Sequence, residues 1–243
     1  TQTQTIGANK MFIFDPINAT PPVASINCGT DANTSPCFGA ASAVSSSGDI
    51  AGVYVEQPHI GSPAAFALST RGLTENDKAT TIFAPTTKNY YYDATAGFTV
   101  MNTGSAPANA QITLSVTGVQ PNSAAARAGV RVGDVFVDNE IIPPGQSLVF
   151  GPFNNNLGGM PKGTFAAAIV TSIDDATYDP QLLAGVSNEA KKTTLLSGGN
   201  AKAVYYGYAP SQATSQLACP VVTELVSNQT GGMSVVNVGD APA

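Results

Sequence analysis

The sequence predicts an all-β protein built from antiparallel sandwich domains, and three observations support this fold class. Helix signals are nearly absent, because only residues 123–128 (SAAARA) have the composition of a helical turn or two. Short apolar or alternating runs recur between Gly, Pro and Asn residues, which is typical of many short strands joined by turns. Long stretches of the chain are also repeated, and the longest of them recurs 135 residues further along.

The clearest predicted strand is the alternating segment QITLSV at residues 111–116. Ile112, Leu114 and Val116 fall on one face of this segment and polar residues fall on the other. This alternation predicts an antiparallel strand that is buried on one side. The other predicted strands are short apolar runs at residues 11–14, 52–55, 135–137, 147–150, 165–171 and 203–208.

The internal repeat is the most informative feature of the sequence. Residues 83–108 align with residues 218–243 without a gap, and nine of the 26 positions are identical. The identical positions include glycines and prolines, which restrict backbone geometry and therefore favour shared turns. Upstream, IAGV at residues 50–53 matches LAGV at 183–186, whereas residues 59–72 depart from the pattern and have no clear register.

The repeat predicts three parts of the chain. Residues 1–57 correspond to the back half of a sandwich, residues 58–182 to a complete sandwich and residues 183–243 to the front half of another. The alternating residues 1–7 (TQTQTIG) have the pattern expected for the strand after residue 108. We therefore expect two sandwich domains per repeating unit, one of them completed between subunits.

An incomplete sandwich needs a complement, because it exposes an apolar sheet face and unpaired strand edges. The donor could be a neighbouring copy, the chain's own opposite half, or the next unit of a longer tandem array. The first route joins copies head to tail into a homopolymer, in the manner of donor-strand complementation. The subunit-interface residues expected on this route are Thr1, Gln2, Thr3, Gln4, Thr5, Ile6, Met233, Val235, Val236 and Val238.

The chain contains three cysteines. Cys28 and Cys37 flank a turn rich in Gly, Asn, Ser and Pro, so we expect a disulfide between them, with two reduced buried thiols as the alternative. Cys219 has no partner assigned by the sequence. Glycans are further expected partners, with acceptor sequons at Asn18, Asn33 and Asn228.

Composition limits the partners. Charged residues make up 11% of the 243 residues, against about 25% in an ordinary domain, and the net charge is −6. We expect no nucleic-acid partner, because the 10 Lys and Arg form no basic stripe. We also expect no membrane span, because no apolar run reaches the ~18 residues that a span requires. The neutral, hydroxyl-rich composition favours self-association.

Three segments resemble a repeat found in large bacterial surface and secreted proteins. They are LAGVSNEA, AVYYGYAP and TGGMSVVNVGDAPA, and the resemblance covers nearly the whole chain. It implies immunoglobulin-like β-sandwiches and an extracellular or cell-surface location. The chain opens at Thr1 without Met, which fits a processed, exported protein. Assembly of bacterial pilins by donor strands is similar in principle.

Several motifs could indicate other functions. His59 is the single histidine and has no nucleophile motif around it, so we expect neither an enzyme nor a cofactor or metal site. Residues 118–139 resemble part of a PDZ domain, but they lie inside the repeat and are expected to form a short helix and a Gly-Asp turn into a strand. The acidic residues 172–179 lack calcium-loop spacing, and the tyrosines at 90–92 and 205–208 are expected to lie on both faces of strands.

The sequence therefore predicts a structural role: a subunit of an extracellular filament, such as a pilus-like fibre or sheath. One alternative is a segment of a large surface-layer protein or adhesin. A second alternative is a self-closed, two-domain secreted carbohydrate-binding module.

Overall fold

A computed structural model provides the coordinates of the chain. The structure describes residues 3, 5, 6, 11, 41–47, 49–56, 68–192, 200–216, 235 and 237. It divides into two units, residues 1–42 and residues 43–243, which are described separately. The described residues of the first unit lie in no helix or strand, so the account below concerns the second.

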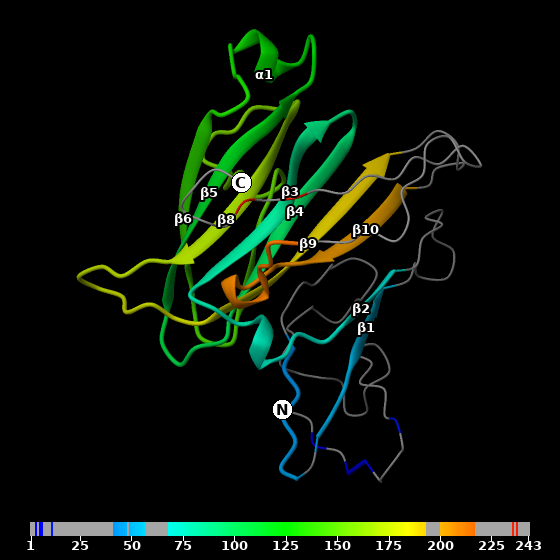
Figure 1. The fold of residues 1–243 in the computed structure, drawn as a ribbon, viewed down its shortest axis with the longest axis vertical. Helices are drawn as coiled ribbons and strands as arrows, with labels where there is room; N and C mark the ends of the chain where they lie inside the picture. The colour runs from blue at the N-terminus through cyan, green and yellow to red at the C-terminus, as the bar shows by residue number, and fades with distance from the viewer. Residues whose placement is uncertain are drawn as a thin grey trace, which may run out of the picture. The chain divides into compact units, whose positions relative to one another are not determined.

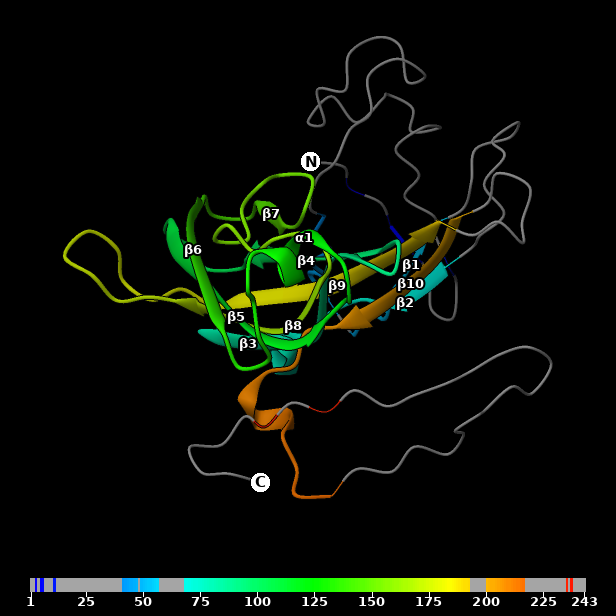
Figure 2. The same cartoon turned by 90° about the horizontal axis from the view of Figure 1, so that it is seen from above.

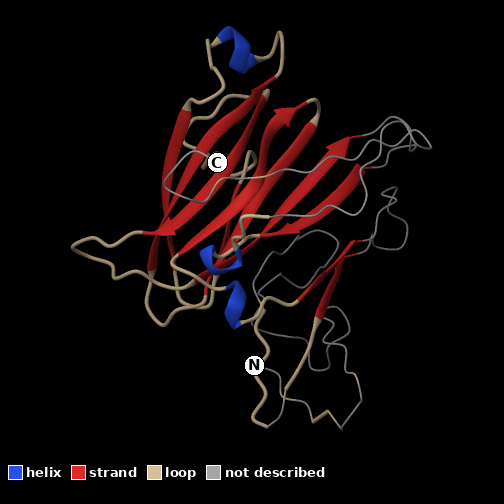
Figure 3. Ribbon diagram, in the orientation of Figure 1, coloured by secondary structure: helices blue, strands red, loops and turns tan. Residues whose placement is uncertain are grey.

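The described residues of the second unit form strands with three short helical turns (Figures 1 and 3). Its elements are β1 (Val53–Glu56), β2 (Leu68–Arg71), η1 (Glu75–Asp77), β3 (Thr81–Tyr91), β4 (Ala94–Asn102), β5 (Ala108–Val119), α1 (Ala124–Arg127), β6 (Val135–Ile142), β7 (Ser147–Phe150), β8 (Thr164–Ser172), β9 (Leu183–Lys192), β10 (Asn200–Tyr206) and η2 (Pro210–Gln212). The pairings are antiparallel throughout the described sheets, which confirms the predicted all-β class.

The large sheet has eight strands in the order β10-β9-β4-β3-β8-β5-β6, and β7 pairs with β4. β3 pairs with β4 only at Lys88 and Tyr91, next to the hairpin turn, and beyond this point β4 pairs with β7 instead. The sheet therefore folds into two layers, one containing β3, β8, β5 and β6 and the other containing β7, β4, β9 and β10. In Figure 2 β7 and β4 lie above β5, β8 and β3.

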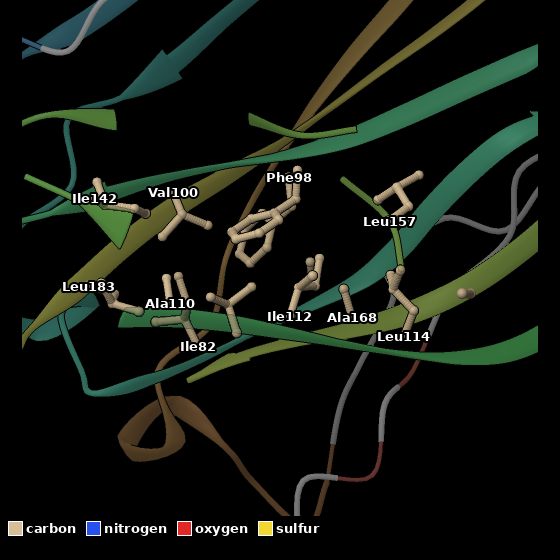
Figure 4. Packing of buried hydrophobic residues seen from close by; sticks show 14 of the residues in the cluster. Ile82, Phe98, Val100, Ala110, Ile112, Leu114, Ile142, Leu157, Ala168 and Leu183 are labelled. Carbon is tan, nitrogen blue, oxygen red and sulfur yellow. The ribbon is translucent and has the colours of Figure 1, made fainter. Parts of the chain in front are cut away.

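The core lies between these layers. Phe98 and Val100 of β4 point toward Ile82 of β3 and Ile112 of β5, and all four side chains are fully buried (Figure 4). The alternation predicted for residues 111–116 is confirmed, because Ile112, Leu114 and Val116 are at most 2% exposed and the residues between them are partly exposed. Burial of such side chains stabilises the fold by roughly 1.5–3 kcal/mol each.

The PDZ-like segment folds as expected from its turn residues. Ser123 is the N-cap of α1, and its hydroxyl accepts a hydrogen bond from Ala126 N at 3.2 Å. Gly133 (φ +95°) then forms the turn that leads into β6. The positive φ explains the glycine, because L side chains disfavour this conformation.

The strands that follow residue 182 pair with the central sheet. β9 begins at Leu183 and pairs with β4 from Ala94 to Asn102, and β10 continues the same layer. The division of the chain into residues 1–57, 58–182 and 183–243 stays a prediction, because similarity between repeats does not say which sheet a strand joins.

Candidate functional site

Four of the predicted interface residues belong to the described part of the chain. Thr3, Thr5 and Ile6 are exposed, with 42% exposure for Ile6, and Val235 is 62% exposed. The other predicted interface residues lie outside the described residues. So do Cys28, Cys37 and Cys219, the sequons at Asn18, Asn33 and Asn228, and His59.

The structure contains two strand pairs with the same pairing pattern. In β1–β2, Val53 lies opposite Arg71 and Glu56 lies opposite Leu68. In β9–β10, Val186 lies opposite Tyr206 and Glu189 lies opposite Ala203. These are the same positions once 50–53 is aligned with 183–186 and the second strands are aligned 135 residues apart. At residues 68–71, which lie in the segment whose register the sequence left undefined, the strand pairing is therefore the same as in the second copy.

The hydrogen bonds that follow these strands are also duplicated. Gly72 N donates to Gly52 O at 2.8 Å, and Gly207 N donates to Gly185 O at 2.8 Å. Each copy then enters a 3-10 turn, η1 or η2, at equivalent residues. Within the described residues, the two copies thus share the strand pairing and the turn that follows it.

Each turn is closed by its third residue. The Asp77 carboxylate accepts from Thr74 N at 2.7 Å, and the Gln212 side-chain carbonyl accepts from Ala209 N at 2.8 Å. These bonds satisfy a backbone donor that a short helical turn leaves without a partner.

Asp77 is also the centre of an ion pair. Its carboxylate accepts two hydrogen bonds from the Arg71 guanidinium, both at 2.6 Å, in a bidentate arrangement. The Asp77 side chain is 1% exposed and the Arg71 side chain is 46% exposed. The bonds from Arg71 lower the pKa of Asp77, against the opposing effect of burial, and the bonds from Thr74 and Gln212 act in the same direction as Arg71. The same contact with Asp77 raises the pKa of Arg71.

The two copies contact each other at equivalent residues. Gln212 Nε2 donates to Asp77 Oδ1 at 2.9 Å, and these positions are 135 residues apart. Arg71 N donates to the Tyr206 hydroxyl at 2.6 Å, again with a separation of 135 residues. The Arg71 guanidinium also stacks on the Tyr206 ring, 4.5 Å from its centroid. Below, "the junction" means Arg71, Asp77, Tyr206 and Gln212.

Sequence reasoning missed the junction. Its four residues form two pairs of unlike side chains, so no identity marks them as equivalent. The available signal was the alignment of Gly72 with Gly207. This pair extends the gap-free alignment of residues 83–108 with 218–243 in the N-terminal direction.

Other polar groups in the central sheet also have structural roles. Lys88 and Glu189 form an ion pair at 2.5 Å between β3 and β9, with both side chains largely buried. The Tyr205 hydroxyl lies 3.4 Å from Glu189, and burial together with this carboxylate raises the pKa of Tyr205. Tyr91 packs against Phe165. These tyrosines contact neighbouring side chains of the same unit.

The acidic segment at residues 172–179 forms a hydrogen-bonded turn. The Asp175 carboxylate accepts from Asn109 Nδ2 at 2.6 Å, from Thr177 N and from Tyr178 N. The bond from Asn109 is the main cause of the lowered pKa of Asp175. Among the described residues, no group of three or more His, Cys, Asp or Glu side chains is arranged to hold a metal ion.

A small hollow lies beside the β7–β8 connection. Asn89 is buried there and donates from Nδ2 to Met160 O at 2.6 Å. The hollow has a volume of about 80 Å³, enough for a few water molecules. Its lining residues are Asn89, Pro152, Asn155, Leu157, Gly159 and Met160.

Comparisons of the chain with family models, with curated proteins and with solved structures gave no significant match. Within the described residues, no helix has the length and apolar character needed to cross a membrane.

Proposed function

We propose that the chain is a structural building block of an extracellular filament or sheath, built from two immunoglobulin-like sandwiches, one of which is completed by strands from elsewhere. One observation carries this proposal. β1–β2 has the register and turn of β9–β10, but among the described residues it forms a two-stranded sheet, whereas β9 pairs with β4. A two-stranded sheet alone is marginally stable in water, so β1–β2 requires further strands.

The strand order supports the immunoglobulin-like part of the proposal. β3, β8 and β5 are neighbours in one layer, in the relation of strands B, E and D of a constant-type immunoglobulin domain. β4, β9 and β10 are neighbours in the other layer, in the relation of strands C, F and G. β6 and β7 follow β5 and add one strand to each layer.

A second surface supports self-association. β6 is the last strand of the sheet order, and Val135, Val137 and Ile141 are 55%, 47% and 43% exposed on one of its faces. An edge strand with exposed apolar residues is a favourable surface for contact with another chain. Copies with a completed second sandwich could therefore still associate through β6.

The ionisable residues also favour a structural role. Asp77 is bonded to Arg71, Thr74 and Gln212, and Glu189 is bonded to Lys88, so these carboxylates hold elements together. The hollow beside the β7–β8 connection is smaller than the roughly 300 Å³ at which ligand pockets begin.

The test is electron microscopy of secreted material combined with the intact mass of its dissociated subunits. The proposal expects fibres or sheets that dissociate into copies of about 24.6 kDa. Replacing Val135 and Val137 by Lys should shorten or abolish these assemblies, whereas replacing the exposed Val132 by Lys serves as a control outside β6. A much larger covalent mass would favour a segment of a surface-layer protein or adhesin. Compact particles would favour the closed two-domain alternative.

A further inference from the structure

The hollow beside the β7–β8 connection is lined by a polar side chain with an unpaired atom. Asn89 lines this hollow and is buried, with 8% of the residue exposed. Its amide is fixed in orientation, because Nδ2 donates to Met160 O and a carbonyl oxygen can only accept. Oδ1 therefore points away from Met160 O, and no described residue donates to it. A buried acceptor without a donor is unfavourable, so a ligand or water that donates here gains stability.

The hollow opens to solvent and has room for part of a small molecule. Asn155 and Gly159 are exposed members of its lining. Its volume of about 80 Å³ admits a hydroxymethyl group, which has the bulk of roughly two water molecules, but not a whole ligand. A larger ligand must therefore place one arm in the hollow and rest its other atoms on the surface outside.

Two aromatic residues lie next to the lining of the hollow. Tyr90 follows the lining residue Asn89, and their rim is completed by Phe153. Phe153 follows Pro152, which also lines the hollow. The Tyr90 and Phe153 rings meet edge to face with centroids 6.2 Å apart, and Lys162 Nζ lies 4.5 Å from the Tyr90 centroid. These contacts position the Phe153 ring while leaving the residue 78% exposed, so an apolar face of a ligand can stack on it.

The backbone beside the hollow is strained at two residues. Tyr90 and Asn155 have positive φ values of 51° and 56°. This conformation is unfavourable for a bulky residue such as tyrosine. Strained residues persist where the surrounding structure holds them, and they cluster at ligand-binding sites, so these two residues support a binding role for the hollow.

The groups around the hollow favour a neutral hydroxyl donor. The unpaired atom of Asn89 is an acceptor, which disfavours an anion. None of the described lining residues is charged, and the ammonium of Lys162 lies on the neighbouring Tyr90 ring, so a cation is disfavoured as well. Among neutral donors, a sugar combines hydroxyl groups with an apolar C–H face. These two features match the Asn89 oxygen and the Phe153 ring.

We propose that this hollow and the adjoining Phe153 ring bind a hexose unit of a glycan. The hydroxymethyl group of the sugar enters the hollow and donates to Asn89 Oδ1, and the C–H face of the sugar ring stacks on Phe153. One enclosed group and one ring contact give weak binding, roughly millimolar for a single sugar, so firm attachment requires many copies at once. A filament or sheath would present such copies, but the site does not depend on assembly.

Saturation-transfer NMR of the full chain tests this proposal, because it observes the ligand and works with single subunits and large assemblies alike. The probes are the methyl glycosides of glucose, galactose and mannose. Each is paired with the pentoside that lacks the hydroxymethyl group, namely xylose, arabinose or lyxose. At least one hexoside should bind with strong transfer to its hydroxymethyl protons, and its pentoside should bind about tenfold more weakly or less.

A pair of variants tests the stacking ring. Phe153→Ala should weaken hexoside binding by about tenfold, and the fold should be unchanged because the side chain is exposed. The control is Tyr208→Ala, which removes another exposed aromatic side chain. Tyr208 pairs with Phe83, near the other end of β3 from Asn89, so this variant should bind the hexoside as the wild-type chain does.

Three results would overturn the proposal. The first is that none of the hexosides binds, which would leave the hollow to ordered water. The second is equal binding of the hexosides and their pentosides, or equal weakening by Phe153→Ala and Tyr208→Ala. The third is binding of a blocked dipeptide, a neutral N–H donor, without binding of any hexoside. Fibre formation is tested separately by the electron microscopy described above, so either proposal can fail without the other.

Discussion

The chain contains one strand pair in two different environments. β9–β10 is bordered by β4 and has Phe98 against its glycines, whereas β1–β2 forms a sheet of its own among the described residues. The register, the glycine hydrogen bond and the 3-10 turn are nevertheless the same in both. Local structure in this repeat is therefore determined by residues within the pair. Burial, and with it most of the stability, depends on strands from elsewhere in the chain.

The largest expected effect on stability comes from Phe98, the β4 side chain that packs against the glycines of β9–β10. Phe98→Ala should lower the free energy of unfolding by about 3–5 kcal/mol, because a fully buried ring is lost and a cavity remains. Chemical denaturation measures the change. Phe153→Ala, at a position that is 78% exposed, is the control and should change stability little. Equal effects of the two variants would contradict the assignment of Phe98 as the main contact of the glycines.

The next test compares the two turn-closing residues. Asp77→Ala should cost about 2–3 kcal/mol, because it removes the ion pair with Arg71 and the bonds from Thr74 and Gln212. Gln212→Ala should cost about 1 kcal/mol, because it removes only neutral donors and acceptors. Glu75→Ala is the matched control in η1, since the Glu75 side chain is 84% exposed and its pair with Lys78 lies at the surface. If Gln212→Ala lowered the free energy of unfolding as much as Asp77→Ala, the ion pair with Arg71 would not be the main contribution of Asp77 to stability.

The glycines allow a direct comparison of the two copies. Gly207→Ala should cost about 1–3 kcal/mol, because the new methyl group would meet the Phe98 ring. Gly72→Ala should change stability by about 0.5 kcal/mol or less, because an added Cβ at this position would meet only the Gly52 carbonyl oxygen, at an ordinary distance of 3.6 Å. Thermal unfolding of the two variants measures the difference. Equal costs would contradict the assignment of Phe98 as the side chain that fills the space beside Gly207.

The smallest expected effect is the pH dependence of the junction. The pKa of Asp77 is lower in the folded chain than its ordinary value, so its contribution to stability is present above about pH 4 and is lost as the pH falls toward the folded pKa. Between pH 4 and pH 2 the wild-type chain should therefore lose on the order of 1 kcal/mol more stability than Asp77→Asn. Thermal unfolding at a series of pH values measures this difference. Parallel curves for the two proteins would contradict the assignment.

Alternation and turn residues were sufficient to predict much of the central unit. The buried face of residues 111–116, the strands at 147–150 and 165–171, and the short helix followed by a Gly-Asp turn are all observed. These features depend on the period of a strand and on backbone preferences, which act over a few residues. The expected interface at Ile6 and Val235 remains a prediction, since both are exposed in separate units of the structure.

The sequence by itself determined the strand content and the repeat, because alternation and turn residues act between residues close together in the chain. Only the tertiary structure decided that residues 183–206 belong with β4, and that Arg71 meets Tyr206 and Asp77 meets Gln212. The repeat makes two sheets equally suitable for the same strand, so local preferences cannot choose between them. That choice depends on contacts between segments that are distant in sequence, and these form only when the chain folds.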